Sequence, residues 1–266
     1  MRLITANLNG IRSAATKGFF DWLPQQNADL LGVQEVKAQH EHVDQVFCSS
    51  GGLKGHFHYA QKKGYSGVGL YSRIEPSDII KGFGVQEFDD EGRWVEMRFD
   101  KPGRKLSIIS CYFPSGSSGP ERQEAKYRFL AAMYPYLMAL KAEREFILVA
   151  DVNIAHKPAD LKNWKGNLKN SGFLPEERAW LDQLFGSGPN QGGLIDIYRQ
   201  LHPDTTDECY TWWSNRGQAY AKNVGWRLDY HLATPALAGA ARSASIFKDQ
   251  KFSDHAPLTI DYDFNL

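Results

Sequence analysis

Short apolar runs rich in β-branched and aromatic residues recur along the whole chain and predict β-strands. Turn-forming residues separate them, so each run has the length of one strand rather than of a long helix. The predicted strands are residues 3–8, 30–33, 68–71, 94–99, 106–113, 146–150, 228–233 and 258–262.

Helical patterns, with apolar residues three and four positions apart, are fewer. They predict helices over residues 18–26, 41–48, 121–141 and 176–185, and Pro135 predicts a kink in the third of them. A single doubly wound parallel sheet needs a helix between nearly all strands, and residues 57–113 lack one. The pattern therefore favours an α/β fold with two packed sheets and helices outside them.

Composition narrows the class of protein. The 266 residues are 42% hydrophobic and 13% aromatic, which is enough for a large core and excludes disorder over most of the length. We find no internal repeat or linker and expect one domain over residues 1–266. No apolar run approaches the roughly 18 residues of a membrane span. The N-terminus enters a strand pattern at once, so we expect a cytoplasmic protein.

Cysteine and charge counts exclude further classes. Cys48, Cys111 and Cys209 are too few and too widely spaced for a disulfide framework or a thiolate zinc site. Lys and Arg number 31, as do Asp and Glu, so net charge does not indicate a polyanionic partner. A neutral chain can still carry a basic face. Basic residues gather between Lys157 and Lys169.

Acidic and amide residues stand where predicted strands end, which is where functional sites are built. Turn formation alone explains any one of them, but five such strand ends together indicate a site. Oxygen ligands without thiolates suit Mg²⁺ or Mn²⁺ better than zinc. Neither a nucleophile elbow nor a phosphate-binding glycine loop is present. The residues are Asn7 and Asn9, Glu35, Asp151 and Asn153, Asp229, and Asp254 with His255.

The strings around these residues resemble the exonuclease III family of apurinic/apyrimidinic (AP) endonucleases, which lies within the endonuclease/exonuclease/phosphatase superfamily. They occur in family order and cover nearly the whole chain. They comprise Asn7-Leu8-Asn9-Gly10-Ile11-Arg12, Gln34-Glu35-Val36-Lys37, Ala150-Asp151-Val152-Asn153, Asn163-Trp164-Lys165-Gly166-Asn167 through Asn170-Ser171-Gly172-Phe173, Gly225-Trp226-Arg227-Leu228-Asp229-Tyr230 and Ser253-Asp254-His255-Ala256-Pro257.

The resemblance implies a four-layer α/β sandwich, with two mixed sheets packed face to face and helices outside. It also implies roles for individual side chains. Glu35 would be the main metal ligand, with Asn7 and Asp254 near the ion. Asp151, helped by Asn153, would orient or deprotonate the attacking water. His255, held by Asp229, would contact the scissile phosphate, and Tyr112 would be a further phosphate contact or proton donor.

The same resemblance implies the substrate. Asn163, Lys165, Asn167 and Asn170 would contact phosphates beside a DNA lesion, which positions the DNA without identifying its sequence. Residues Trp212, Trp226 and Leu228 would wall a pocket for the extruded sugar, and Arg227 would be a further contact to the DNA or its lesion. A nucleotide without a base stacks poorly, so flipping it costs less than flipping an intact one. Ser115 stands where many family members have Asn.

We therefore expect a Mg²⁺-dependent, monomeric DNA repair nuclease that cleaves 5′ to an abasic site in duplex DNA and leaves a 3′-hydroxyl, with Mn²⁺ able to replace Mg²⁺. Blocked 3′ ends are expected as further substrates, through 3′-phosphodiesterase, 3′-phosphatase or 3′→5′ exonuclease activity. The alternatives are a 3′-end processor with little AP endonuclease activity, a phosphatase of lipid or inositol phosphates, and a noncatalytic protein that binds damaged DNA.

Overall fold

Two large β-sheets form the centre of the structure, a computed structural model that describes residues 1–266. The first sheet has seven strands, and only its β1–β2 pair is parallel. In spatial order these strands are β14 (Ala241–Ile246), β15 (Leu258–Tyr262), β1 (Arg2–Asn7), β2 (Leu30–Gln34), β5 (Val68–Ser72), β4 (Leu53–His58) and β3 (Ser49–Ser50).

The second sheet has six strands, and only its β8–β9 pair is parallel. Its order is β10 (Ile195–Asp196), β13 (Asp229–Ala233), β9 (Glu145–Asp151), β8 (Leu106–Tyr112), β7 (Trp94–Arg98) and β6 (Asp78–Lys81). A separate two-stranded ribbon joins β11 (Trp212–Trp213) to β12 (Gly225–Trp226).

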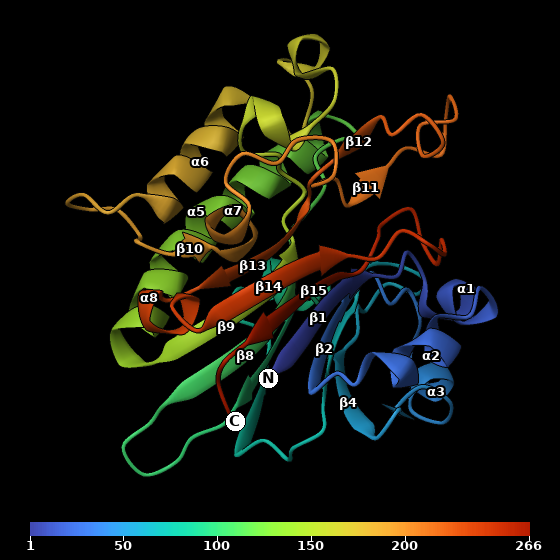
Figure 1. The fold of residues 1–266 in the computed structure, drawn as a ribbon, viewed down its shortest axis with the longest axis vertical. Coiled ribbons are helices and arrows are strands. Elements are labelled where there is room, and N and C mark those ends of the chain that lie inside the picture. The colour runs from blue at the N-terminus through green and yellow to red at the C-terminus, as the bar shows by residue number, and fades with distance from the viewer.

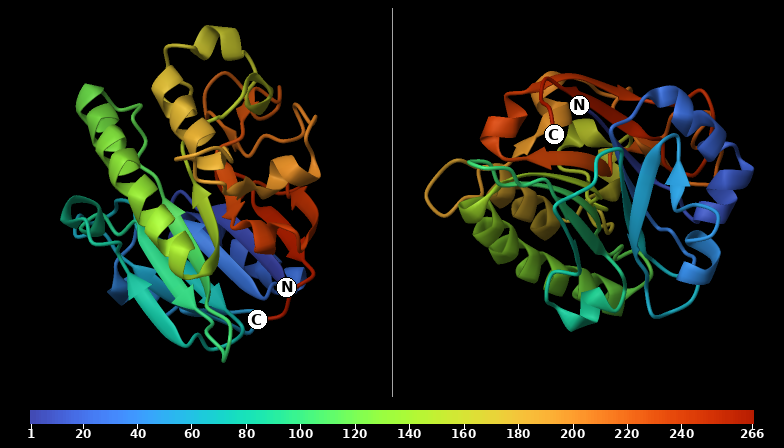
Figure 2. Two further views of the ribbon diagram at one scale, coloured as in Figure 1. Left: turned by 90° about the vertical axis from the view of Figure 1, so that its left-hand side faces the viewer. Right: turned by 90° about the horizontal axis from the view of Figure 1, so that it is seen from below.

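Helices cover the outer face of each sheet (Figures 1 and 2). The seven-stranded sheet carries α1 (Ile11–Thr16), α2 (Phe19–Trp22), η1 (Leu23–Gln26) and α3 (His40–Val43). The six-stranded sheet carries α5 (Pro120–Glu143) and α6 (Pro175–Phe185). This arrangement confirms the expected α/β sandwich. The shorter elements are α4 (Gln86–Asp89), η2 (Pro158–Asp160), η3 (Trp164–Asn167), α7 (Ile197–Leu201) and α8 (Pro235–Ala238).

Strand periodicity explains how three hydrophobic layers arise. In β1, Leu3 points into the core between the two sheets, whereas its neighbour Ile4 packs under α1 and α2. In β9, Val149 faces the same central core and Leu148 packs under α5 and α6. Gly32 lies where the sheets approach closely, because a Cβ there would overlap the side chain of Val149.

The structure differs from the sequence-based expectation in several elements. The helix expected over 41–48 is only the single turn α3, since the apolar positions beyond Val43 do not all reach the core and Val46 is exposed. The helix expected over 18–26 is divided into α2 and η1, with Pro24 in the first turn of η1. The helix expected over 121–141 is α5, which runs without a break from Pro120 to Glu143 and contains Pro135.

No helix is both long and apolar enough to cross a membrane.

Seven strands were missed from the sequence: β3, β4, β6, β10, β11, β12 and β14, of which β3, β10, β11 and β12 are only two residues long. β3 and β6 are short and, like β14, lie at or next to a sheet edge where one side of the strand has no partner. Many of their residues are polar and exposed or half-buried, so they lack the apolar signal of central strands.

Candidate active site

Polar side chains replace apolar ones at one end of the central core. Asn7 ends β1, Tyr112 ends β8, Asp151 ends β9 and Asp229 begins β13. Each follows the alternation of the inward-facing residues of its strand, so all four point between the sheets. Direct pairing sets Asp151 beside both Asp229 and Tyr112. The strand pattern therefore accounts for the convergence of these side chains.

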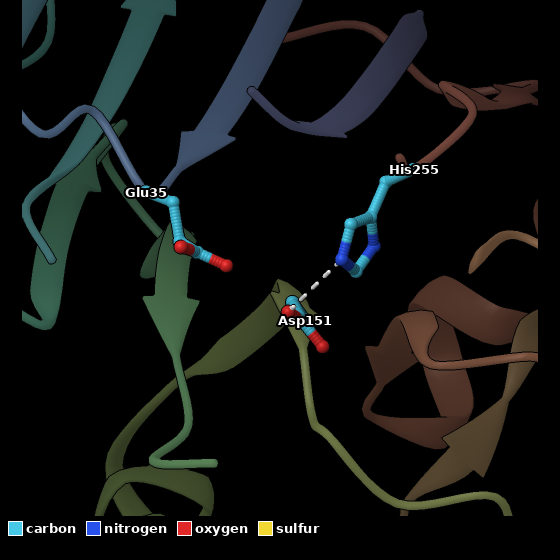
Figure 3. Close-up of side chains that lie close together, drawn as sticks. All are labelled: Glu35, Asp151 and His255. Carbon is cyan, nitrogen blue, oxygen red and sulfur yellow. Dashed lines mark ion pairs between the residues drawn. The ribbon is translucent and has the colours of Figure 1, made fainter. Parts of the chain in front are cut away.

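Two carboxylates meet at this end of the core and share one amide donor. Asn7 Nδ2 donates to Glu35 Oε1 and to Asp151 Oδ2, each at 2.8 Å. Ligand atoms of Glu35, Asp151 and His255 lie within 4.8 Å of one another (Figure 3). Glu35 follows β2 with a φ of 50°, a left-handed conformation that costs energy in a residue other than glycine. This backbone conformation is consistent with a functional position.

His255 is fixed between two carboxylates. Its Nδ1 lies 2.8 Å from Asp229 Oδ2, and its Nε2 lies 3.7 Å from Asp151 Oδ2, the ion pair drawn in Figure 3. The hydroxyl of Thr211 accepts from the backbone N–H groups of Leu228 and Asp229, while the Thr211 carbonyl accepts from Ala256. These bonds tie the start of β13 to the segment that carries His255.

The surroundings shift the acid–base behaviour of this group. Burial raises the pKa of Asp151 to about 7, and the neighbouring carboxylates of Asp229 and Glu35 add to the shift while His255 opposes it. Burial acts against the charged form of His255, yet the charges of Asp229 and Asp151 outweigh it and raise the pKa of His255 to about 10. The site thus holds a carboxylate that titrates near neutral pH beside a protonated imidazole.

Tyr112 and Asn153 complete the polar group. Burial, together with the charges of Glu35 and Asp151, raises the pKa of the Tyr112 hydroxyl well above its usual value, so it remains a donor. The Asn153 amide donates to Asp151 Oδ2 at 3.3 Å and to Phe113 O at 3.0 Å. The Asn153 backbone N–H donates to Asp151 Oδ1 at 2.9 Å. Asp151 is therefore held from several sides.

Asp254 lies beside this cluster, linked to it through Asn9. Asp254 Oδ1 accepts from Asn9 Nδ2 at 2.9 Å, and Oδ2 accepts from Trp212 Nε1 at 3.2 Å. Burial opposes ionisation of Asp254, but His255 and these donors lower its pKa below the usual value. Asp254 is consequently an anion that joins the hydrogen-bonded group indirectly, because Asn9 also donates its backbone N–H to Asn7 Oδ1.

The donor set fits a hard divalent cation. Glu35, Asp151 and Asp254 offer carboxylate oxygens, and no thiolate is near. His255 belongs to the same cluster, but a protonated imidazole has no free lone pair for a metal. The residues that can hold an ion are therefore the carboxylates, with Glu35 at their centre.

A cavity of about 290 Å³ opens directly above these groups. Trp212, Trp226 and Leu228 form its apolar wall, and Trp212 and Trp226 pair across the ribbon β11–β12 with ring centres 6.2 Å apart. Gly172 lines the same cavity, and a Cβ there would lie 3.2 Å from the Trp226 ring. The cavity combines a charged floor with an aromatic wall.

The loop of residues 163–170 lies to one side of this cavity. Asn163, Lys165 and Asn170 are exposed, and Asn167 is half-buried. Asn167 and Asn170 line an adjoining open cavity that shares Trp226 with the first. Asn170 Nδ2 donates to Asn167 Oδ1, and Asn167 Nδ2 donates to Asn163 O. These hydrogen bonds thus fix the positions of the Asn167 and Asn170 side chains at the rim of the cavity.

Arg227 requires a correction, because it was expected among the DNA-contacting residues. It is fully buried, and its guanidinium donates to Asp160 and Asp196. Trp226 and Leu228 on either side of it line the cavity, whereas Arg227 does not. Arg227 is therefore held in the interior by Asp160 and Asp196. It fixes the segment between Trp226 and Leu228 and does not reach a ligand surface.

Sequence reasoning missed other residues of the site. Lys37 lines the cavity, and its Nζ lies 2.6 Å from Glu35 Oε2. The feature of the sequence that could have indicated it is its position two residues after Glu35. Lys126 and Glu177 form a fully buried ion pair of 2.7 Å beneath the cavity, where Lys126 also donates to Asn153 O. The signal for Lys126 was its position on the apolar face of α5, in register with Phe129 and Leu130.

Comparisons with known proteins identify the family of the chain. Residues 4–255 match the profile of the Endonuclease/Exonuclease/phosphatase family. The exodeoxyribonuclease of Bacillus subtilis (strain 168) is 34% identical over 261 residues, and the match covers 98% of each chain. The DNA repair nuclease APEX1 of Danio rerio is 34% identical over 263 residues, with 98% of this chain and 81% of that protein covered.

A solved structure shows the same architecture. The AP endonuclease LMAP from Leishmania major matches with a TM-score of 0.84 and 26% identity, and the match covers 97% of this chain and 86% of the other. Both sequence relatives are nucleases by name, and the two-sheet sandwich matches the fold of the AP endonuclease structure. The chain belongs to the endonuclease/exonuclease/phosphatase family.

Proposed function

We propose that this protein is a Mg²⁺-dependent DNA repair nuclease that hydrolyses the phosphodiester 5′ to an abasic site and leaves a 3′-hydroxyl. The proposal depends on one observation: a small cavity with Trp212 and Trp226 in its wall lies directly above the cluster of Glu35, Asp151 and His255. The relatives named as an exodeoxyribonuclease and a DNA repair nuclease support DNA as the substrate.

Phosphodiester hydrolysis needs a base for water and donors for the developing charge. Asp151, with a pKa of about 7, accepts the proton of the attacking water, and Asn153 holds the carboxylate in position. His255 is protonated and donates from Nε2 to a phosphate oxygen, while Asp229 orients its ring. Tyr112 remains protonated and is a second donor.

Glu35 would hold the Mg²⁺ ion, with Asn7 and Asp254 next to it. When bound, the ion supplies Lewis-acid stabilisation of the negative charge that develops on the phosphate, and Mn²⁺ would supply the same chemistry. The gathering of the Glu35, Asp151 and Asp254 carboxylates at the cavity floor supports this assignment.

The aromatic wall supports a lesion without a base. Trp212, Trp226 and Leu228 offer an apolar surface to a deoxyribose, and Gly172 leaves the space beside Trp226 open. Extruding an abasic nucleotide loses little stacking or pairing, so a small pocket selects it over an intact nucleotide. Lipid and inositol phosphates would not need this wall.

Duplex DNA would lie across the rim of the cavity. The proposed phosphate contacts are Asn163, Lys165, Asn167 and Asn170 on the loop beside Trp226. The protein would act on the DNA as a monomer. The free thiols of Cys48, Cys111 and Cys209 suit a reducing compartment such as the cytoplasm.

The second candidate is a 3′-end processor with little AP endonuclease activity. The exodeoxyribonuclease name of the Bacillus subtilis relative favours it, and a terminal phosphodiester needs the same base and donors as an internal one. Removal of blocked 3′ ends is therefore proposed as an accompanying activity. A noncatalytic DNA-binding protein is disfavoured, since such a protein has no need of a carboxylate with a raised pKa beside a protonated histidine.

The decisive experiment uses a 5′-labelled duplex with one internal abasic analogue, with Mg²⁺ and with EDTA in parallel. Metal-dependent cleavage immediately 5′ to the analogue is expected, and Asp151→Asn and Glu35→Gln should abolish it without loss of folding. Trimming of the 3′ end with an intact lesion would favour the second candidate. An active Asp151→Asn protein would overturn the mechanism.

A further inference from the structure

Lys37 enters the site on an unusual stretch of backbone. Glu35 and Lys37 both have a φ of 50°, while Val36 between them is buried under the first sheet. The N–H groups of Val36 and Lys37 donate to the carbonyls of Gly67 and Ser66, which fixes this conformation. As a result Glu35 and Lys37, two positions apart, both line the cavity.

The ammonium group of Lys37 bridges the acidic residues of the site. Nζ lies 2.6 Å from Glu35 Oε2 and 2.5 Å from Asn9 Oδ1. The Asn9 amide donates in turn to Asp254 Oδ1 at 2.9 Å. Lys37 is thus a cation between Glu35 and the Asn9–Asp254 pair, which is where the proposed metal ligands meet.

Both oxygens of Glu35 already have partners. Asn7 Nδ2 occupies Oε1, and this amide is only 1% exposed and also binds Asp151. Lys37 occupies Oε2 from a long side chain that is 32% exposed. Of the two partners, Asn7 is fixed by β1 and by Asp151, whereas Lys37 can rotate into the open cavity at little cost. A cation that binds Glu35 would therefore displace Lys37.

We propose that the Lys37 ammonium is the resident cation of the metal-free site and competes with the divalent ion for Glu35. This inference rests on the proposed function, because it assumes that Glu35 holds a metal. Lys37 neutralises the carboxylates before the ion arrives and lowers the affinity of the site for that ion. Once displaced, its ammonium points into the cavity, toward the place of the substrate phosphate.

Electrostatics gives the direction of the effect. A divalent ion at Glu35 and an ammonium within a few ångströms repel each other, and the ion must also break the Lys37–Glu35 pair. Removing the ammonium while keeping an unbranched apolar side chain that reaches as far as Cε, as in Lys37→Met, takes away both costs. The Lys37→Arg variant keeps the charge and so keeps the competition.

The test measures metal binding without DNA, by calorimetric titration of the metal-free protein with MnCl₂. We expect Lys37→Met to bind Mn²⁺ about tenfold or more tightly than the unaltered protein, and Lys37→Arg to remain close to it. Lys105→Met is the matched control, because Lys105 is an exposed lysine at the opposite end of β8 from the site and has no ion pair to Glu35. Equal or weaker binding by Lys37→Met would overturn the proposal.

Thermal unfolding gives a second measurement that does not depend on activity. In EDTA the Lys37→Met protein should melt at a lower temperature than the unaltered protein, because its carboxylates lose their cation, and MnCl₂ should raise its Tm by the larger amount. Equal shifts in the two proteins would contradict the competition. If the unaltered protein binds no Mn²⁺, the proposed function itself fails. If it binds Mn²⁺ and cleaves DNA but Lys37→Met binds no more tightly, only the role of Lys37 fails.

Discussion

Two buried histidines show how neighbouring side chains decide the charge of a residue. His255 lies against Asp229 and Asp151, whose charges raise its pKa to about 10. His231 lies in the core between the sheets with no carboxylate beside it, and burial lowers its pKa to about 3. One histidine is therefore a cation suited to phosphate, and the other is a neutral core residue. Sequence position alone does not distinguish them.

His231 should make folding sensitive to mild acid. Its pKa is lower in the folded protein than in the unfolded chain, so its contribution is complete above about pH 6.5 and is lost as the pH falls toward 3. The expected slope from this residue is about 1.4 kcal/mol per pH unit. Urea unfolding of the unaltered protein and of His231→Gln should show their difference in stability changing by about 2 kcal/mol between pH 6.5 and 5. Parallel pH curves would contradict this assignment.

Asp229 should control the alkaline limit of activity through His255. Replacing Asp229 with Asn removes the charge that raises the pKa of His255, so the imidazole loses its proton at a lower pH. We expect kcat to fall on the order of 100-fold and the alkaline limb of the pH–rate profile to move to lower pH. An unchanged alkaline limb with reduced kcat would instead indicate a purely structural role for Asp229.

Two outer helices, α5 and α6, each contribute a buried side chain that binds the backbone of a loop at the cavity. Lys126 of α5 binds the carbonyl of Asn153, and Glu177 of α6 accepts from the backbone N–H groups of Gly172 and Leu174. The two side chains pair with each other while fully buried. The loop that orients Asp151 and the loop that carries Gly172 are thus joined to the helix layer by one ion pair.

Replacing only one residue of the Lys126–Glu177 ion pair should lower the stability of the protein. Lys126→Met leaves the Glu177 carboxylate buried without its cation, which we expect to lower the free energy of unfolding by about 3–5 kcal/mol. The double variant Lys126→Met/Glu177→Gln removes both charges and keeps an acceptor for the loop, so it should be more stable than Lys126→Met alone. Urea denaturation of the single and double variants measures this coupling. Strictly additive losses would show that the two side chains act independently.

The whole molecule places its chemistry at one end of the central core. Strands β8 and β9 run in parallel from Leu106 and Glu145 to Tyr112 and Asp151, so the site lies at their carboxyl ends. A different set of cations, including Lys105 and Lys141, surrounds the opposite ends of these strands. With 31 basic and 31 acidic residues, overall charge cannot attract DNA, and only the arrangement of charges on the site face can.

DNA affinity should therefore depend on salt through local contacts. Binding of abasic duplex in EDTA should weaken linearly in log salt, with a slope of about −0.9 for each phosphate contacted. Lys165→Gln, at the rim of the site, should reduce the slope by about one contact. Lys105→Gln, at the far end of β8, is the charge-matched control and should leave the slope unchanged. The reverse result would place the DNA on the other end of the molecule.

Much of the site followed from local pattern. Alternation along the strands is a property of the backbone, so the inward direction of Asn7, Tyr112 and Asp151 could be inferred once their strands were recognised. The motif strings added Glu35 and His255, and the comparisons confirm the family in which these strings occur. The sequence failed for residues whose surroundings come from distant segments.

Arg227 is the clearest of these failures. Nothing in the string Trp226-Arg227-Leu228 shows that Asp160 and Asp196 will bury the guanidinium between them. The buried pair Lys126–Glu177 is a similar case, because its two residues lie on different helices. The helix expected over 41–48 ended at Val43, and beyond it Phe47 packs on the core whereas Val46 is exposed, a difference that depends on distant residues such as Phe20.

The sequence by itself determined the central strands, the class of fold, the family and the polar residues at the strand ends, because these depend on periodicity and on short strings. Only the tertiary structure decided which side chains are charged, which are buried and which touch. Asn7 and Asp151 share a hydrogen bond across 144 positions of sequence, and Lys37 lies on Glu35 through a left-handed turn of the backbone. Such contacts arise when the sheets pack, and burial then sets the pKa values on which the proposed chemistry depends.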